Sequence, residues 1–158
     1  MAEQLDVRWR HARAWLERVR ATSERIEPLT REVRAYEAAR QQILPWRSTG
    51  GGGSALHSDP TAAAAEGRLG ELDALIADSQ ARLDAACDVV GACLGVLARM
   101  ERELGERHAR ALEWYYVDRM PTWSDVAREL RCGRTSLWQI RCGAYEWIER
   151  NCQCRLYE

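Results

Sequence analysis

Two long stretches of the chain place apolar residues in alternating steps of three and four. The first begins at Leu5 and reaches Val33, and the second keeps the same steps from Leu69 to Leu104, with Ser79 as its polar member. This spacing puts a narrow apolar stripe on one face of a helix, so we expect two long amphipathic helices. At 1.5 Å per residue the second would be about 50 Å long. One such helix cannot cover its stripe alone.

The segment between the two stretches carries strong turn signals. Pro45 is expected to stop the first helix, and Pro28 to kink or divide it, because proline lacks an N–H and clashes with the preceding turn. Gly50 to Gly53 follow, and then Asp59 and Pro60, which suit the cap and first position of a new helix. The flanking helices are rich in Arg and in acidic residues, respectively. We therefore expect an antiparallel helical hairpin, or coiled coil, over residues 1–106 with a Gly-rich tip loop at 45–60.

Two alternatives to the hairpin stay open. The glycine-rich segment would also serve as a flexible tether, and the two stripes would then pair between chains instead of within one. A homodimer through the helical hairpin is therefore a further expectation.

Residues 107–158 show a different pattern. A short helix is expected to end near Asp118, and Met120-Pro121 breaks the chain before the next one. The Thr122 hydroxyl is suited to accept from the first-turn N–H groups of that helix, and Asp125 adds a charge favourable to its dipole. The helix is predicted to end at about Leu130.

The following residues have the spacing of a helix-turn-helix, in which two short helices cross at a tight turn and need a small residue where they approach. Ala127 is that residue, Cys132 fills the turn, and Gly133 is available to start the second helix. The inward apolar positions are Val126, Leu130, Leu137 and Ile140. The predicted fold is therefore all-α, with a helical hairpin followed by a C-terminal helix-turn-helix module.

The second helix of that module, at about residues 134–143, leaves polar side chains outside. Arg pairs with guanine and Gln with adenine in the major groove, while phosphate contacts position a protein on the duplex. Formal net charge is −1, but residues 128–141 hold four Arg against Glu129 alone. The expected base contacts are Arg134, Thr135, Ser136, Trp138 and Gln139, and the expected phosphate contacts are Arg128, Arg131 and Arg141.

At these residues the sequence resembles a known family. The stretch YYVDRMPTWSDVARELRCGRTSLWQIRCGAYEWI is similar to the helix-turn-helix of sigma-factor region four and of phage ArpU/RinA-like transcriptional regulators. WSDVAREL matches their (Y/W)xxIAxxL, and RTSL matches the start of their recognition helix. Arg131 and Gly133 depart from the family, which usually has Gly and Ser there. The resemblance implies a phage or prophage regulator of transcription that binds DNA, with RNA polymerase as a further partner.

The cysteines and histidines favour neither a metal site nor an enzyme. Cys132, Cys142, Cys152 and Cys154 lie within a short span and His108 is nearby in sequence, but no CxxC pair occurs. The three histidines are scattered, and the glycine run lacks the Lys and Ser/Thr of a P-loop. We therefore expect no cofactor, no metal and no catalytic residue.

The remaining expectations concern location and competing functions. The N-terminus has no apolar signal region, and the longest uncharged stretch, Val89 to Ala98, is shorter than the roughly 20 residues a bilayer span needs. We expect a cytoplasmic protein without a membrane partner. Two other functions combine similar helices: a small-terminase-like phage packaging protein and a helical adaptor that does not bind DNA.

Overall fold

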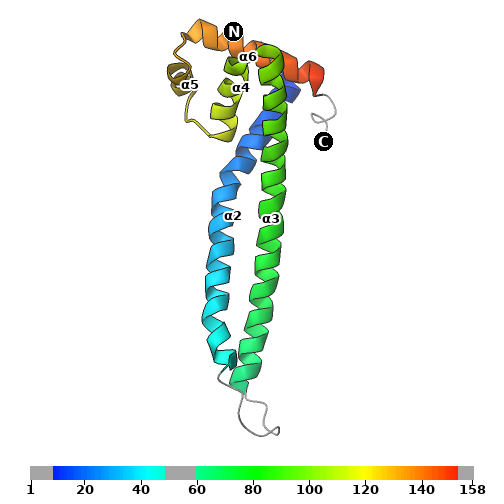
Figure 1. Cartoon of the computed structure of the whole chain (residues 1–158), viewed down its shortest axis with the longest axis vertical. Helices are drawn as coiled ribbons and strands as arrows, with labels where there is room; N and C mark the ends of the chain where they lie inside the picture. Colours follow the sequence, from blue (N-terminus) through cyan, green and yellow to red (C-terminus); the bar gives the residue numbers. More distant parts are fainter. Residues whose placement is uncertain (1–8, 49–59, 153–158) are drawn as a thin grey trace. The chain divides into compact units, whose positions relative to one another are not determined.

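The computed structural model describes residues 9–48 and 60–152, and every regular element within them is a helix (Figure 1). The all-α prediction is therefore confirmed for these residues. The long helices are α2 (Arg10–Ser48) and α3 (Pro60–Leu104). They are followed by α4 (Glu106–Leu112), the π-helix η1 (Glu113–Val117), α5 (Trp123–Glu129) and α6 (Arg134–Asn151).

The prolines of α2 do not interrupt the helix. The helix continues through Pro28 and through Pro45 to Ser48, so the predicted stop at Pro45 was wrong, and of the two effects predicted for Pro28, a kink or a division, the division does not occur. A proline removes one backbone hydrogen bond, and a helix of this length retains many others. α3 begins at Pro60, as expected. Residues 45–48 of the predicted tip loop are therefore helical, and Gly50 to Gly53 and Asp59 lie outside the described residues.

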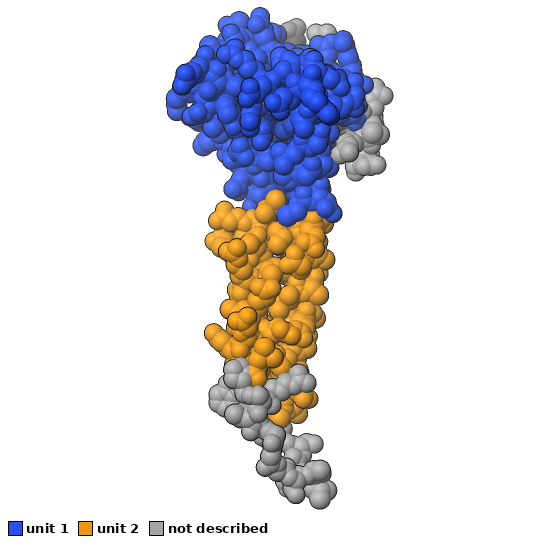
Figure 2. Space-filling view, viewed as in Figure 1, with its two compact units in different colours: residues 1–25, 86–158 blue, residues 26–85 orange. Residues whose placement is uncertain are grey.

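The chain forms two compact units (Figure 2). Unit 1 comprises residues 1–25 and 86–158, and unit 2 comprises residues 26–85. These limits do not coincide with the predicted boundary at residue 106. The reason is that the first turns of α2 and the last turns of α3 share a core with the C-terminal helices.

Unit 2 consists of one segment of α2 and one of α3. Leu29 and Val33 are buried from α2, and Leu69 and Ser79 from α3. Three polar contacts join the two segments: Arg40 Nε lies 2.6 Å from Asp73 Oδ1, Ser79 Oγ donates to Glu32 Oε1 at 2.8 Å, and Arg82 Nη1 lies 3.6 Å from the same Glu32 oxygen. Higher numbers in α2 pair with lower numbers in α3, so the segments run antiparallel.

Unit 1 has a larger core, drawn from α2, α3, α4, η1 and α6. Leu16, Met100, Leu112, Tyr145 and Ile148 are all fully buried in it. The hydroxyls of Tyr116 and Tyr145 hydrogen-bond to each other at 2.9 Å inside this core. Burial raises the pKa of the Tyr116 hydroxyl, so this hydroxyl stays neutral. The hydrogen bond satisfies two polar groups that burial removes from water.

Two contacts attach α6 to the long helices of unit 1. Glu149 Oε1 accepts from the backbone N–H groups of His11 and Ala12, at 3.0 and 2.9 Å. The carboxylate thereby serves donors that the first turn of α2 leaves without a helical partner. Trp147 Nε1 donates to Glu103 Oε2 of α3 at 2.8 Å. The C-terminal half of α6 is therefore bound to both long helices.

A glycine separates α3 from α4. Gly105 has φ +100°, a conformation that L side chains rarely adopt. Its N–H still donates to Glu101 O at 2.9 Å, which completes the last turn of α3. The chain then restarts as α4, and α4 passes directly into the wider turn of η1, where Asp118 N–H donates to Glu113 O at 2.9 Å.

Candidate nucleic-acid interface

The start of α5 has the predicted cap. Thr122 Oγ1 accepts from the Asp125 backbone N–H at 3.2 Å and donates to Asp125 Oδ2 at 2.6 Å. The hydrogen bond from the Thr122 hydroxyl, together with the nearby Arg128 charge, lowers the pKa of the Asp125 carboxyl. The carboxylate therefore stays charged at the N-terminus of α5, where the helix dipole favours it.

The turn after α5 closes with two backbone hydrogen bonds. Cys132 N–H donates to Ala127 O at 3.0 Å, and Arg131 N–H donates to Arg128 O at 3.1 Å. With Leu130 as the C-cap, these are the two bonds of a Schellman motif, whose residue after the cap adopts the left-handed conformation and is usually Gly. Arg131 occupies that position with φ +50°. Arg131 therefore occupies the position of this turn that favours glycine.

The predicted inward residues of α5 and α6 come together in one apolar cluster. Val126 is fully buried, and Leu130, Leu137 and Ile140 retain at most 8% exposure. Ala111 of α4 completes the cluster, and Ala127 and Cys132 are partly buried against it. This cluster fixes α5 on α6 and decides which side of α6 faces outward.

The first half of α6 presents the residues that sequence analysis assigned to DNA bases. All five are exposed: Arg134, Thr135, Ser136, Trp138 and Gln139. Trp138 retains 41% exposure, which is high for a large apolar side chain, because its contact with water is unfavourable. α6 starts at Arg134 as expected but continues to Asn151, beyond the predicted end near 143, because Ala144, Trp147 and Ile148 pack into the core of unit 1.

An open groove of about 390 Å³ lies between α5 and α6. It is lined by three residues predicted to contact DNA, Arg134, Trp138 and Arg141, and by Trp123 and Ser124 of α5. Trp123 and Ser124 were not among the residues predicted to contact DNA. The relevant signal was their position directly after the Thr122 cap, since the first turn of α5 faces the same side as the start of α6.

The three predicted phosphate contacts differ in their surroundings. Arg128 is exposed and lies 3.2 Å from Asp125 Oδ1, and Arg131 is exposed in the turn. Arg141 is partly buried, and its guanidinium carbon lies 3.9 Å from the centroid of the Trp123 ring. Its Nη2 is 3.5 Å from the Tyr145 hydroxyl. Arg141 thus stacks between α5 and α6, where an arginine over a tryptophan face is attracted by the ring electrons.

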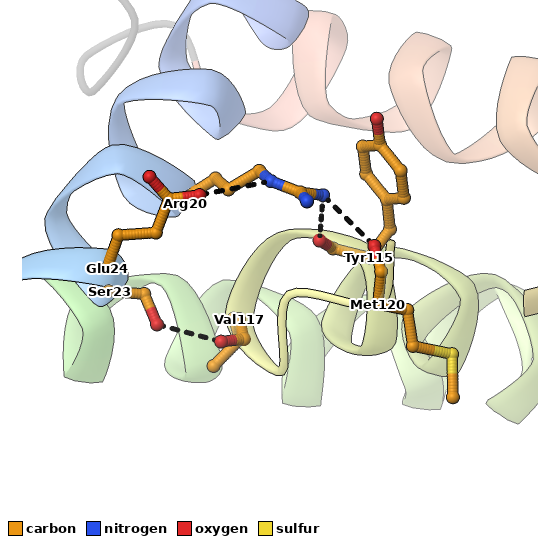
Figure 3. A network of polar contacts seen from close by, with 6 residues as sticks. All are labelled: Arg20, Ser23, Glu24, Tyr115, Val117 and Met120. Carbon is orange, nitrogen blue, oxygen red and sulfur yellow. Dashed lines mark hydrogen bonds and ion pairs between the residues drawn. The ribbon is translucent and has the colours of Figure 1, made fainter. Parts of the chain in front are cut away.

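A polar network anchors this region to α2 (Figure 3). Arg20 Nη1 donates to the carbonyls of Tyr115 and Met120, at 2.7 and 3.3 Å, and its guanidinium lies 4.4 Å from the Tyr115 ring centroid. Ser23 Oγ donates to Val117 O at 2.8 Å. These carbonyls belong to η1 and to the turn before α5, so α2 holds the segment that leads into the interface. No sequence pattern indicated this role for Arg20.

Tyr115 and Trp123 extend the same support. Their rings stack with centroids 4.0 Å apart and an interplanar angle of 15°. Arg20 lies over one ring and Arg141 over the other, so two cations and two aromatic rings form a continuous stack from α2 to α6. Within unit 1 this stack sets the position of the first turn of α5.

The cysteines raised in sequence analysis do not form a ligand set in the described part of the chain. No group of three His, Cys, Asp or Glu side chains lies close enough to hold a metal there. Cys132 and Cys142 are partly buried, Cys152 is buried, and Cys154 lies outside the described residues. None of the helices in residues 9–48 and 60–152 has a segment apolar enough to cross a bilayer.

Comparisons of the chain with protein-family models, with curated proteins and with solved structures returned no match.

Proposed function

We propose that this protein is a sequence-specific, double-stranded-DNA-binding transcriptional regulator of the phage type. Its antiparallel long helices act as a hairpin, and α5 and α6 act as a helix-turn-helix. The observation that carries the proposal is the exposed first half of α6, held on α5 by a buried cluster and a tight turn. That arrangement suits entry of a helix into the major groove, where its first residues meet base edges.

Roles follow from the placement of the side chains. Arg134 and Gln139 are exposed and have the donors and acceptors that distinguish guanine and adenine. Thr135 and Ser136 lie between them near the N-terminus of α6, and Trp138 offers an apolar surface to a sugar or a thymine methyl group. Arg128 and Arg131 are exposed at the end of α5 and in the turn, in position to contact phosphates on either side of the groove.

The direct test is a selection of duplexes from a random pool, followed by binding measurements on the selected site. We expect wild-type affinity to fall steeply with salt, because phosphate contacts release counterions. Replacing Arg134 and Gln139 together with Ala should weaken binding at least ~30-fold, since each base contact contributes roughly 1–3 kcal/mol. Arg150→Ala, which removes an exposed arginine at the far end of α6, is the matched control and should leave the affinity unchanged.

The alternatives predict different results. A helical adaptor would retain no duplex at low salt, and the double variant would then match the wild type. A packaging protein of the small-terminase type would bind DNA as a ring of many copies, which light scattering separates from a monomer or dimer. Either result would overturn the regulator proposal.

A further inference from the structure

A second stripe runs along α3 on the side away from the core of unit 1. Asp88, Gly91, Gly95, Ala98 and Arg102 follow one another in steps of three and four, the heptad spacing of a helix-pairing seam. All five residues are exposed. The core stripe of the same helix, through Cys93, Leu97 and Met100, faces the opposite way. α3 therefore has two seams, and none of the described residues covers the second.

The composition of this second seam is that of a buried surface. From Val89 to Ala98 the helix holds no charged or polar side chain, and a helix that is apolar on every side is normally covered. Leu94 flanks the seam with 39% exposure, and Cys87 is exposed beside it. A Cβ added to Gly91 or to Gly95 would meet no atom of the described residues within 4 Å, so no close contact in that part of the chain requires either glycine.

Charges at the two ends of the seam decide what covers it. Asp88 stands at one end and Arg102 at the other, with only Gly91, Gly95 and Ala98 between them along the seam. A second copy laid antiparallel brings each acid toward the other copy's arginine. A parallel copy would place Asp88 beside Asp88 and Arg102 beside Arg102, which is unfavourable. The surface is therefore complementary to itself in one orientation only.

We propose that two copies of this chain associate through this seam, with their α3 helices antiparallel about a two-fold axis between Gly91 and Gly95. Gly91 of one copy lies opposite Gly95 of the other, and Asp88 opposite Ala98. Arg102 of the second copy lies one helical turn beyond the Ala98 of that copy. Side chains on a helix tilt toward the N-terminus of the helix, so this Arg102 side chain reaches back toward Asp88 of the first copy. The absence of side chains at the centre lets the two backbones approach closely. Such an interface is isologous, as in most homodimers.

The pairing also has a consequence that rests on the proposed function. A two-fold pair carries two α6 helices related by the same axis, so its DNA site would be an inverted repeat. The pairing itself is independent of DNA and is tested without it.

The experiment is sedimentation velocity of the full chain from micromolar to submillimolar concentration. The wild type should form a dimer. Asp88→Arg and Arg102→Asp should each weaken the dimer at least ~10-fold, because each places like charges together. The double reversal should bind more tightly than either single variant, but it should recover only part of the affinity because position 102 also faces Asp84 of the other copy. Recovery in the double variant separates a pairing contact from a loss of folding.

A second pair of variants tests the glycines. Gly91→Gln with Gly95→Gln should abolish the dimer while helicity by circular dichroism stays the same or rises, because Gln favours a helix more than Gly. The control is Gly67→Gln with Gly70→Gln, at two α3 positions that are equally open, and it should leave association unchanged. A wild type that stays monomeric throughout, single reversals without effect, or a double reversal that binds no more tightly than either single variant would each overturn the proposal.

Discussion

The two halves of α6 have opposite surroundings although they belong to one continuous helix. From Arg134 to Gln139 every side chain except Leu137 is exposed, whereas from Ala144 to Ile148 every side chain except Glu146 is buried. The second half is a structural anchor, packed against both long helices. The first half rests only on α5 and the apolar cluster beneath it. The first half of α6 can therefore be polar and open because the stability of its helix comes from elsewhere.

The strongest way to test this contrast is to truncate one side chain in each half. Ile148→Ala should destabilise the protein by about 2–5 kcal/mol, since Ile148 is fully buried. Gln139→Ala should change the free energy of unfolding by no more than about 0.5 kcal/mol, while it weakens DNA binding. Urea unfolding and duplex binding, measured on both variants, give the comparison.

Glu146→Ala is the control within the second half, because Glu146 is partly exposed and pairs only with Arg150 four residues away. This replacement should change neither the free energy of unfolding nor the affinity for duplex DNA appreciably. If Gln139→Ala were as destabilising as Ile148→Ala, the two halves would not differ as described.

Arg141 stands between the two halves, and its replacement separates anchoring from DNA contact. Arg141→Ala removes the stacked guanidinium from Trp123 and should cost about 0.5–2 kcal/mol of stability. Arg128→Ala should have a smaller effect on stability, because exposed ion pairs contribute little, but it should reduce the salt slope of DNA binding by about 0.9. Thermal unfolding and salt titrations of both variants test this distinction. If Arg141→Ala lowered the salt slope of DNA binding and left stability unchanged, Arg141 would be a phosphate contact and not a structural anchor.

The turn that joins α5 to α6 offers a gain in stability. Arg131 has φ +50°, where a residue with a Cβ is strained and Gly is not. Arg131→Gly should therefore stabilise the protein by about 0.5–1 kcal/mol, which thermal unfolding will detect as a rise in Tm. Arg128→Gly, the same replacement within α5, should lower Tm because Gly disfavours a helix. If Tm fell equally in both variants, Arg131 would not be strained in its left-handed conformation.

The smallest expected effect is a dependence of stability on pH. Burial lowers the pKa of His108 below its usual value of 6.5, so the unfolded chain binds a proton that the folded chain rejects. The contribution of neutral His108 to the free energy of unfolding is complete above pH 6.5. It is lost as pH falls through that value toward the lowered pKa of the folded state. His108→Gln should flatten the decline in unfolding free energy over this range. If the unfolding free energy of the wild type and of the variant declined equally as pH falls, the decline would come from other titratable groups.

Local chemistry made much of the C-terminal region predictable. The Thr122 cap, the Asp125 charge in the first turn and the end of α5 near Leu130 depend on neighbours within four residues. The inward set Val126, Leu130, Leu137 and Ile140 follows from helical periodicity. The exposed set on α6 is the complement of that inward set. These features follow from residues that are close together in the chain.

Other features depend on residues far apart in the chain, and no local pattern contained them. Arg20 reaches the carbonyl of Tyr115, and Glu149 caps the first turn of α2. The length of α6 and the inward stack of Arg141 likewise depend on partners that only the folded chain brings near.

The amino-acid sequence by itself determined that the described chain is helical, where α5 begins and which side of α6 is apolar, because caps and periodicity act over one or two turns. Only the tertiary structure decided that α2 continues through its prolines, that Arg131 takes a left-handed conformation, and that the ends of the long helices join the C-terminal core. Packing free energy is summed over contacts between distant segments, and such a sum outweighs the preference of a single residue.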